Sequence, residues 1–520
     1  MSEAPQPLQQ ALLLLQQGEG RQAEALLRQL MAEQPQWPQP PYLLGLVLVQ
    51  SQRMAEAASA FAAACRLQPA LLPAWLNNAA ALEHLDQLEA ALAQLQQAMA
   101  FHRDQPDLLA AAGRLAVKLE RWSEAQALLE QALAEGIPIS RSGTHLGIAL
   151  LEQGQHLQAV AVLHQVVQQQ PQDPQALYNL ALALKDAQQL EAALQALDQL
   201  LGLAPNHPGL HGNRAIVLFL LGRYREAWQE YQWRLVETPQ IVQQPPLRQY
   251  HRQMGRVNRL LVLAEQGLGD SLQFVRYLNG IAAQANTLQL VVQPPLVNWL
   301  QRCFPEVEVT PAPWQAEQVE QVDAWLPLIS AAALLEISPQ QPGACPPYLH
   351  VEPERVQHWQ QQLGPSAKRR IALAWQGNPT AERGHARGRS LPLAALAPLM
   401  SRADLELISV QRGAGSEQID QLGWRDHFHP LQHELDGIWD FEEIAAILHS
   451  CDLLISSDSA ITHLAGACGL PAVLLLKWTP DWRWGLQGER CFWYPNHRLF
   501  RQLENETWPE TVQRLMDQGC

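Results

Sequence analysis

The sequence predicts a superhelix of paired α-helices followed by an α/β region built from two Rossmann-like halves. Two observations carry this prediction. Alanine recurs at a fixed spacing through the first half of the chain, and short apolar runs alternate with helix-length segments through the second. A long fixed period indicates a helical repeat array, and alternating strands and helices indicate parallel βαβ units. A chain of 520 residues is also long enough for several domains.

The repeat keeps a period of 34 residues without an insertion. The recurring alanines are Ala23, Ala57, Ala91, Ala125, Ala159, Ala193 and Ala227. Other phases repeat small, large and helix-ending residues, namely Gly45, Gly113 and Gly147, then Leu27, Phe61, Leu95, Leu129, Leu163, Leu197 and Tyr231, and Pro35, Pro69, Pro171 and Pro205. Small residues let paired helices approach and large ones fill the groove between them. The pattern resembles tetratricopeptide repeats and assigns residues 1–237 to seven of them.

Stacked helix pairs of this kind form a concave face that usually binds a peptide or a partner domain. A spacer or an oligomerisation arm is the alternative. The last repeat is unusually aromatic, with Tyr224, Trp228, Tyr231 and Trp233. We interpret it as a docking surface for the region that follows. Acidic and basic residues are mixed along the array, so charge does not identify its partner.

The period stops near residue 238, and residues 238–257, rich in proline and glutamine, are expected to form a linker. The first Rossmann-like half is expected over residues 258–364 and the second over residues 365–520. The expected strands are 260–264, 288–292, 324–326, 370–375, 405–410, 453–456 and 472–476, with helices at 271–283, at 295–303 and in a segment ending at residue 362. A ligand would bind between the carboxyl ends of the two sets of strands.

The loop AEQGLGDSLQFVRY follows the first of these strands. A dinucleotide fingerprint would need a third glycine where Leu272 stands and an acidic residue after the next strand, so that interpretation fails. Asp270 is then either a residue that caps a helix or a general base that removes a proton from a sugar hydroxyl. Its position at the cleft favours the base.

Two further segments suit an anion. In CDLLISSDSAITHLAGACGLPAVLLL, Ser459 and Ala460 would open a helix whose free amides favour a diphosphate. An ordinary turn capped by Asp458 or Ser459 is the structural alternative. The loop GNPTAERGHARGRS carries Arg389 and also Arg383, His385 and Arg387, and a solvated surface loop is its alternative.

Composition excludes several classes of function. A net charge of -15 argues against a nucleic-acid or membrane-surface binder. Seven scattered cysteines without a CxxC pair suit a reducing compartment, and no apolar run is long enough to span a membrane, so a cytoplasmic location is expected. No DxD occurs, and His427, His429 and His433 lack the spacing of metal ligands. Neither a metal nor a bound cofactor is expected.

The second half resembles a glycosyltransferase of the two-Rossmann GT-B type and is most similar to the heptosyltransferase family. The segments that carry the resemblance are LVLAEQGLGDSLQFVRYL, IALAWQGNP, RGRSLPL, LISVQRGAGSEQ and DLLISSDSAITHLAGACGLPAVLLL. The tail PDWRWGLQGERCFWYPNHRLFRQ, together with the repeat segment GRYREAWQEYQWR, resembles bacterial proteins that fuse tetratricopeptide repeats to such a domain. Repeats on a GT-B domain are also a feature of protein O-GlcNAc transferase, whose own catalytic motifs are not found here.

This resemblance implies roles for individual residues. It implies that Asp270 is the catalytic base, that Arg389 lies near the donor phosphates, that Glu417 contacts the ribose and that Asp458 contacts the donor sugar. The remaining residues of the implied donor site are Gly269, Gly377, Asn378, Ser459, Ala460 and Thr462. The first half is short, so the repeats are expected to supply part of the acceptor site.

The expected function is therefore an inverting, metal-independent glycosyltransferase. It would transfer a sugar from a nucleotide-diphosphate sugar to a protein or glycan recruited by the repeats. Two alternatives stay open at this point. One is a non-catalytic repeat scaffold with a degenerate transferase domain, and the other is an epimerase or hydrolase of sugar nucleotides with the same fold.

Overall fold

The computed structural model describes residues 6–238, 243–382 and 388–519. The chain forms two compact units, Met1–Ala196 and Leu197–Cys520. The last helical repeat thus belongs to the same unit as the α/β region.

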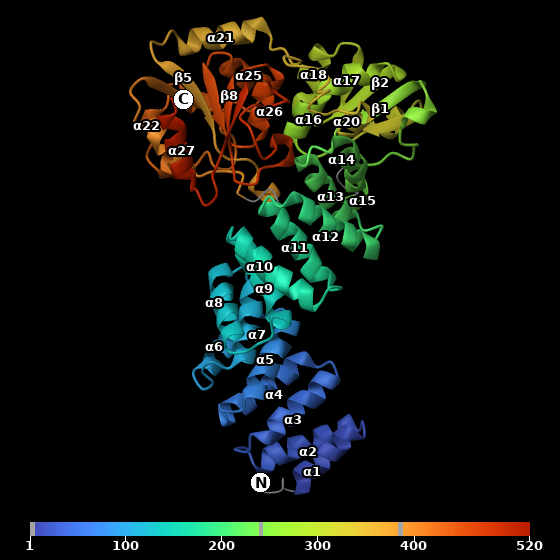
Figure 1. The fold of residues 1–520 in the computed structure, drawn as a ribbon, viewed down its shortest axis with the longest axis vertical. Helices are drawn as coiled ribbons and strands as arrows, with labels where there is room; N and C mark the ends of the chain where they lie inside the picture. The colour runs from blue at the N-terminus through green and yellow to red at the C-terminus, as the bar shows by residue number, and fades with distance from the viewer. Residues whose placement is uncertain (1–5, 239–242, 383–387, 520) are drawn as a thin grey trace. The chain divides into compact units, whose positions relative to one another are not determined.

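The first unit consists of consecutive helix pairs, which Figure 1 shows in blue to blue-green. Its helices are α1 (Gln6–Gln16), α2 (Gly20–Glu33), α3 (Gln39–Gln50), α4 (Met54–Leu67), α5 (Leu72–His84), α6 (Leu88–Met99), α7 (Pro106–Lys118), α8 (Trp122–Ala134), α9 (Ile139–Glu152), α10 (His156–Gln169) and α11 (Pro174–Asp186), followed by α12 (Leu190–Leu203), which continues into the second unit.

The small and large residues of the repeat meet within each pair. A Cβ added to Gly45, Gly113 or Gly147 would lie 2.4 to 2.5 Å from a side-chain atom of Phe61, Leu129 or Leu163. Only glycine permits this approach of the two helices. The predicted tetratricopeptide packing is confirmed, and its period arises because a small residue of one helix meets a large residue of the next at the same position in several repeats.

The second unit begins with the last repeat and continues into a parallel four-stranded sheet. The repeat contains α13 (Pro208–Leu220), α14 (Tyr224–Glu230), a 3-10 turn (Tyr231–Trp233) and α15 (Arg234–Glu237). The sheet has the order β3-β2-β1-β4. Its elements are β1 (Val257–Leu263), α16 (Leu268–Phe274), α17 (Leu278–Ala282), β2 (Ala285–Val292), α18 (Val297–Cys303), β3 (Val307–Pro311), α19 (Ala316–Val319), β4 (Ala324–Pro327) and α20 (Ser330–Leu334).

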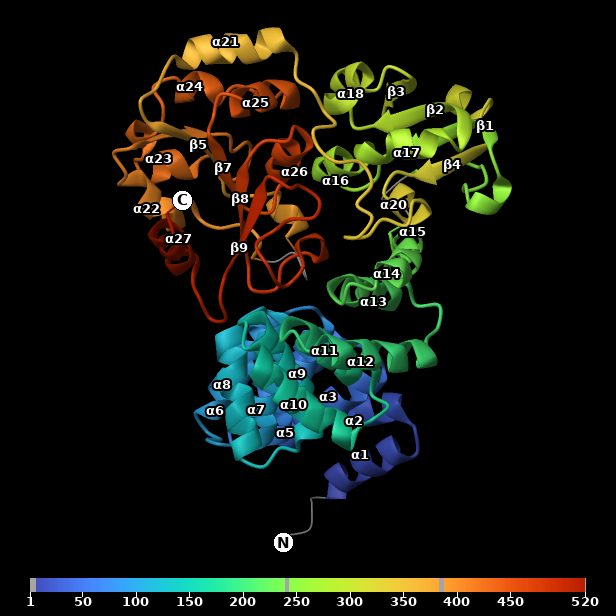
Figure 2. The same cartoon turned by 45° about the horizontal axis from the view of Figure 1, so that its top comes forward.

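After α21 (Pro353–Leu363), a second parallel sheet has the order β6-β5-β7-β8-β9. Its strands are β5 (Arg369–Ala374), β6 (Leu405–Ser409), β7 (Leu453–Ser456), β8 (Ala472–Leu476) and β9 (His497–Arg501). The helices between and after them are α22 (Ala397–Met400), α23 (Gln418–Gln421), α24 (Gln432–Leu435), α25 (Phe441–Leu448), α26 (Ala460–Ala467) and α27 (Trp508–Asp517). Figure 2 shows α16 and α26 where the two halves meet.

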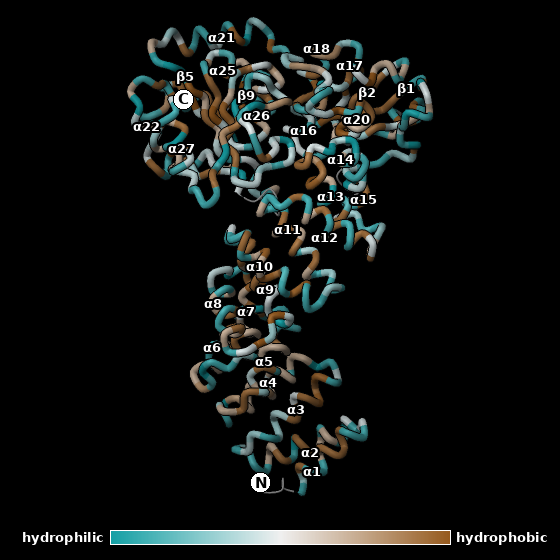
Figure 3. Tube along the Cα trace, in the orientation of Figure 1, coloured by the Kyte–Doolittle hydropathy of each residue, from teal (hydrophilic) through white to brown (hydrophobic). Residues whose placement is uncertain are grey.

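Both sheets are buried, as parallel sheets require. Leu260, Leu261, Val262 and Leu263 of β1 are almost fully inaccessible to solvent. In the second half, Ile371 and Leu373 of β5 form one core with residues of α22, α27 and β9. Figure 3 shows these strands as hydrophobic stretches of the chain. The core thus fixes the strands whose carboxyl ends carry the candidate site.

The two parallel sheets confirm the predicted α/β architecture, and two strands escaped the sequence analysis. Strand β3 has alternating exposed and buried residues, and β9 carries His497, Arg498 and Arg501 among its apolar residues. Both lie at the edge of their sheet. Polar or charged residues interrupt both strands, VEVTP and HRLFR, so neither shows the continuous apolar run by which the other strands were predicted.

Candidate active site

A cavity of about 1030 Å³ lies within the second unit, at the carboxyl ends of strands from both sheets. In each sheet the strand order reverses at the first strand: β1 lies between β2 and β4, and β5 lies between β6 and β7. Ligands of doubly wound sheets bind at such points. The loops after β1, β5 and β7 all contribute to the cavity wall.

Asp270 lies in the first turn of α16, directly after β1. Its Oδ2 atom accepts a hydrogen bond from the backbone N–H of Gly267 at 3.0 Å, while Oδ1 accepts one from Nη2 of Arg483. The carboxylate therefore stabilises the start of the helix and also lines the cavity. Burial raises the pKa of Asp270, and the Arg483 guanidinium opposes that rise.

Gly269 brings the two halves into contact beside Asp270. A Cβ at this position would lie 3.2 Å from the Cα atom of Ala460 and 3.0 Å from Cδ2 of His463. A larger residue would separate the beginnings of α16 and α26. The glycine predicted as part of the donor site thus has a packing role as well.

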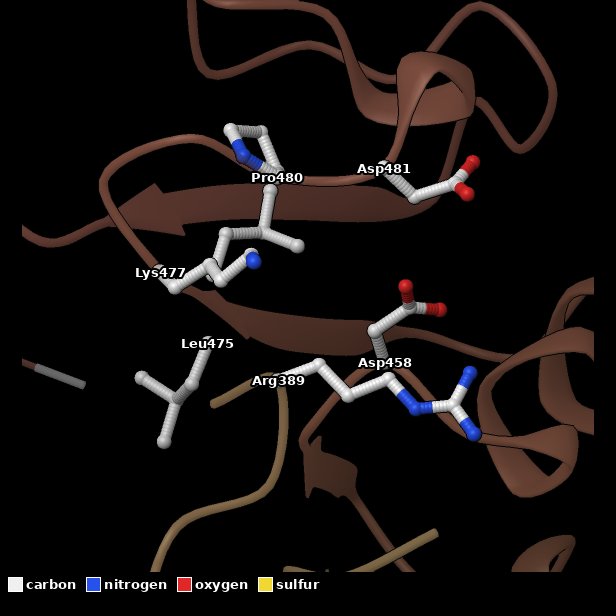
Figure 4. Close-up of a pocket in the computed structure, with 7 residues that line it drawn as sticks. Arg389, Asp458, Leu475, Lys477, Pro480 and Asp481 are labelled. Atoms are coloured by element: carbon white, nitrogen blue, oxygen red, sulfur yellow. The ribbon is translucent and has the colours of Figure 1, made fainter. Parts of the chain in front are cut away.

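The loop after β5 brings a cation to the cavity. Gly377 donates its backbone N–H to Ser390 Oγ at 2.9 Å, which closes the loop at its base. Arg389 lies next to it, and its Nε atom is buried without a hydrogen-bond partner among the described residues. Figure 4 shows Arg389, Asp458 and Asp481 around a small pocket that shares these residues with the large cavity. Arg383, His385 and Arg387 lie outside the described residues.

Helix α26 starts at the cavity as the sequence predicted. Ser459 is its N-cap residue with extended backbone, and its side chain makes no capping hydrogen bond. Ser459 Oγ lies 3.3 Å from Ser456 Oγ instead. The first backbone amides of an α-helix have no partner within the helix, so this end of α26 suits an anion.

Asp458 precedes this helix and is buried. Burial and the Asp481 carboxylate raise the pKa of Asp458 to about 6, although Arg389 and Arg483 act in the opposite direction. The group therefore changes charge near neutral pH, which is common for residues of functional sites.

Sequence reasoning missed Arg483 and Asp481, which follow β8. Arg483 is buried, and each of its three nitrogens donates a hydrogen bond: Nη2 to Asp270, Nη1 to Asp481 Oδ1 at 3.0 Å, and Nε to Gln273 Oε1 at 2.9 Å. Arg483 lies between Trp482 and Trp484 in the segment PDWRWG. A cation so close to the carboxyl end of a parallel strand was the available signal.

An apolar end of the cavity was also missed. Ala414, Trp439, Phe441 and Ile444 line it. Trp439 is 62% exposed, and its ring lies against Gly413, whose Cβ would be 3.7 Å away. An exposed indole that lines a cavity offers a flat apolar surface to a ligand.

The last repeat forms another part of the cavity wall, through Ile216 and Tyr231. Its predicted role as a docking surface is confirmed by several aromatic contacts. Phe219 stacks on Trp482 with ring centroids 4.0 Å apart, and Trp228 Nε1 donates to the carbonyl of Ile337 at 2.8 Å. Trp233 differs from the expectation, since it stacks on His211 of the same repeat.

A buried ion pair also joins the repeat to the first sheet. Arg234 Nη2 donates to Glu265 Oε1 at 2.5 Å and to Ser330 Oγ at 2.9 Å. The Glu265 side chain is fully buried beside the loop that carries Asp270. Burial raises its pKa, while Arg234 acts against that rise. The repeat is therefore part of the support of the cavity.

The cavity brings together most of the predicted site residues. They are Gly269, Asp270, Gly377, Asn378, Arg389, Asp458, Ser459 and Ala460. Thr462 and Glu417 are not among its lining residues: Thr462 is buried and donates to the Ser457 carbonyl at 2.9 Å, and Glu417 is exposed just before α23. The assigned functions of all ten residues stay predictions.

No group of three or more His, Cys, Asp or Glu side chains in residues 6–238, 243–382 and 388–519 is arranged to hold a metal ion. Within the same ranges, no helix combines the length and apolar character that crossing a bilayer requires.

Comparisons with known proteins match both parts of the chain. Tetratricopeptide repeat models match residues 8–71, 144–208 and 181–236. The model of glycosyltransferase family 9 (heptosyltransferase) matches residues 412–513, which include Trp439, Asp458, α26 and Arg483.

Similar proteins include Protein FlbA of Caulobacter vibrioides. It is 28% identical over 454 residues, which cover 79% of this chain and 72% of that protein. Among solved structures, one similar protein is YrrB, described as a TPR protein with an unusual peptide-binding site. It is 22% identical, the match covers 35% of this chain and 94% of the YrrB chain, and the TM-score is 0.33. MamA from Desulfovibrio magneticus RS-1 is also 22% identical, and the match covers 32% of this chain and 93% of the MamA chain, with a TM-score of 0.30.

Proposed function

Because the chain carries tetratricopeptide repeats followed by a glycosyltransferase family 9 domain, we propose that it is an inverting, metal-independent glycosyltransferase that uses a nucleotide-diphosphate sugar. One observation carries the proposal. The carboxylate of Asp270, the guanidinium of Arg389 and the first turn of α26 face one cavity. A base and two anion-binding elements are the groups that such a transfer needs.

In the proposed reaction Asp270 removes the proton of an acceptor hydroxyl as its oxygen attacks the anomeric carbon. The bond from that carbon to the diphosphate oxygen breaks, and the diphosphate leaves with the electron pair. A single displacement of this kind inverts the anomeric configuration. Arg389 and the amides at Ser459 and Ala460 stabilise the charge that develops on the leaving group. Burial raises the pKa of Asp270, which makes it a stronger base than an exposed aspartate.

The rest of the cavity supports donor binding in two ways. The apolar end with Trp439 and Phe441 suits the base of a nucleotide. Asp458 suits a sugar hydroxyl, because a carboxylate accepts hydrogen bonds from such groups. Gly377 and Asn378, on the loop after β5, also line the cavity, and a Cβ on Gly377 would lie 3.2 Å from Nη2 of Arg389.

For the acceptor, we propose a hydroxyl group of a protein or glycan recruited by the repeats. Ile216 and Tyr231 support this proposal, because they bring the last repeat to the cavity wall. Tetratricopeptide repeats bind partner proteins in many systems, which favours a polypeptide acceptor. The proposed location is the cytoplasm, where nucleotide sugars are available.

The test measures donor binding and turnover separately. Thermal unfolding is recorded with UDP, GDP, ADP and CMP and with their sugars, for the wild type and for Asp270→Asn and Ser459→Trp. Saturation at a hundred times the Kd adds about 2.7 kcal/mol of stability. We expect one nucleotide family to stabilise the wild type and Asp270→Asn, and not Ser459→Trp.

Slow hydrolysis of the bound donor sugar then reports on the base, since water replaces the acceptor. Asp270→Asn should lower this rate by about 10²- to 10⁴-fold. Asp323→Asn is the control, because Asp323 also accepts backbone hydrogen bonds, at 2.8 Å from Arg259 N, and is not among the residues that line the cavity. Unchanged hydrolysis in Asp270→Asn, or no stabilisation by any nucleotide, would contradict the proposal.

A further inference from the structure

We infer that Arg483 is a positioning residue for Asp270, which it holds across the boundary between the two halves as an oriented carboxylate. The inference rests on the proposed function, since it assigns Asp270 the role of base. It concerns a residue that no sequence motif indicated.

Arg483 and the backbone of Gly267 together fix the two oxygens of the Asp270 carboxylate. One oxygen of Asp270 accepts from Arg483, and the other accepts from the backbone N–H of Gly267 at 3.0 Å. The Nε atom of Arg483 binds Gln273, which lies on the same helix as Asp270, at 2.9 Å. Two donors of one planar guanidinium thus bind α16, so a rotation of the carboxylate would break a hydrogen bond.

The guanidinium is itself held in place. Its Nη1 atom donates to Asp481 at 3.0 Å, and its central carbon lies 4.6 Å from the ring centroid of Trp482. Trp482 stacks on Phe219 of the last repeat, and the backbone carbonyl of Arg483 accepts from Trp493 Nε1 at 2.8 Å. The last repeat therefore supports the base through Trp482 and Arg483.

A comparison with Arg389 separates positioning from phosphate binding. All three nitrogens of Arg483 donate hydrogen bonds to protein acceptors, while Nε of Arg389 is buried without a hydrogen bond among the described residues and lies 3.8 Å from the Glu382 carboxylate. An arginine that awaits a phosphate needs unused donors directed at the ligand. The geometry thus favours Arg389 as the phosphate ligand and Arg483 as the partner of the base.

The charge of Arg483 matters because the carboxylate is buried among other titratable groups. Those facing it are Arg483 and Asp481 after β8, Arg389 after β5, Asp458 and His463 at α26, Glu265 on its own loop and Tyr231 of the last repeat. Burial raises the pKa of Asp270 and Arg483 lowers it. Without the guanidinium the carboxyl group would hold its proton to higher pH, so a smaller fraction of the protein would carry the base form at neutral pH.

The experiment compares pH profiles of donor hydrolysis for the wild type, Arg483→Met and Arg483→Lys in the full-length chain. Methionine keeps the apolar stem and removes the charge, and lysine restores the charge. We expect the acid limb of the kcat profile to move upward by about one pH unit or more in Arg483→Met and to return toward the wild type in Arg483→Lys. Arg402→Met is the control, because Arg402 forms an exposed ion pair with Asp404.

A weaker donor affinity with an unmoved acid limb would overturn the inference, because it would identify Arg483 as a phosphate ligand. If the wild type hydrolyses no donor, the proposed function fails, and the positioning role is tested by stability instead. Folded Asp270 has a raised pKa, so the stability of the wild type relative to Asp270→Asn falls as pH rises toward that pKa. In the Arg483→Met background the fall should extend to higher pH, and superimposable curves would overturn the inference.

Discussion

The surroundings of individual aspartates in the C-terminal half shift their pKa values in different directions. Asp458 is buried, and burial together with Asp481 raises its pKa to about 6. Asp404 is exposed on the other side of the same sheet, where a hydrogen bond from Arg402 lowers its pKa to about 2. The pKa values of these two aspartates are thus shifted in opposite directions, and of the two only Asp458 titrates near neutral pH.

Asp458→Asn tests this difference through stability. Because the pKa of Asp458 is raised in the folded state, the folded protein holds this proton more tightly than the unfolded chain does. The stability of the wild type relative to the variant therefore falls as pH rises from about 4 to about 6. The two pKa values imply a change on the order of 3 kcal/mol. Thermal unfolding between about pH 4 and pH 8 measures it.

Asp404→Asn is the matched control for this measurement. Its folded pKa of about 2 lies below the range, so the difference between wild type and variant should be flat above about pH 5. A flat curve for Asp458→Asn as well would show that Asp458 does not titrate in this range, and the assigned burial and charge effects would be wrong.

At the scale of elements, the last repeat is the support of the transferase region. Its helices α13 and α14 carry Phe219 and Trp228, which pack on Trp482 and Phe274 of the α/β region. Trp228 is almost fully buried and its indole donates to Ile337. Trp482 in turn packs on the guanidinium of Arg483, which binds Asp270, so the repeat affects the geometry of the cavity.

Trp228→Ala and Trp233→Ala compare a tryptophan that contacts the α/β region with one that packs only on His211 of its own repeat in the ring contacts described. Trp228→Ala should cost about 3 to 5 kcal/mol, because it removes a buried indole and leaves the Ile337 carbonyl without its donor. Trp233→Ala should cost less, since Trp233 is half-buried and stacks on His211. Urea unfolding followed by near-UV circular dichroism measures both, and equal losses would contradict the supporting role.

At the scale of the whole molecule, the compact units do not follow the boundary between repeats and α/β region. The second unit begins at Leu197, within α12, and includes the last repeat. The sequence drew its boundary where the 34-residue period stops, after residue 237. The difference arises because periodicity reports local structure, while compactness depends on contacts such as the Arg234–Glu265 pair.

Two shortened chains test this organisation. A chain that starts at Leu190 keeps α12 and the last repeat, and we expect it to fold and to be stabilised by the same nucleotide as the full chain. A chain that starts at Val257 lacks the whole last repeat, so it loses the Arg234–Glu265 ion pair and exposes the aromatic faces of Trp482 and Phe274 that Phe219 and Trp228 cover. It should not fold, as size-exclusion chromatography and near-UV circular dichroism would show. A folded Val257 chain would contradict the inferred dependence on the repeat.

The sequence predicted much of the fold because regular contacts leave regular patterns. The spacing of Gly45 and Phe61 recurs in later repeats, and the strands between Leu260 and Leu476 are apolar runs of the expected length. Strands β3 and β9 were missed because polar or charged residues interrupt their apolar pattern. Of the candidate site, the segments that follow β1, β5 and β7 were found, since ligands bind at the carboxyl ends of parallel strands.

The sequence alone therefore determined the repeat array, the two parallel sheets and the loops that carry Asp270, Arg389 and Ser459. Only the tertiary structure decided which side chains meet them: Arg483 on Asp270, Trp439 at the apolar end and Tyr231 from the last repeat. The physical reason is the range of the interactions. Helices, strands and turns are set by residues a few positions apart, whereas Asp270 and Arg483 are 213 residues apart in the sequence and are brought together by the packing of two separate sheets.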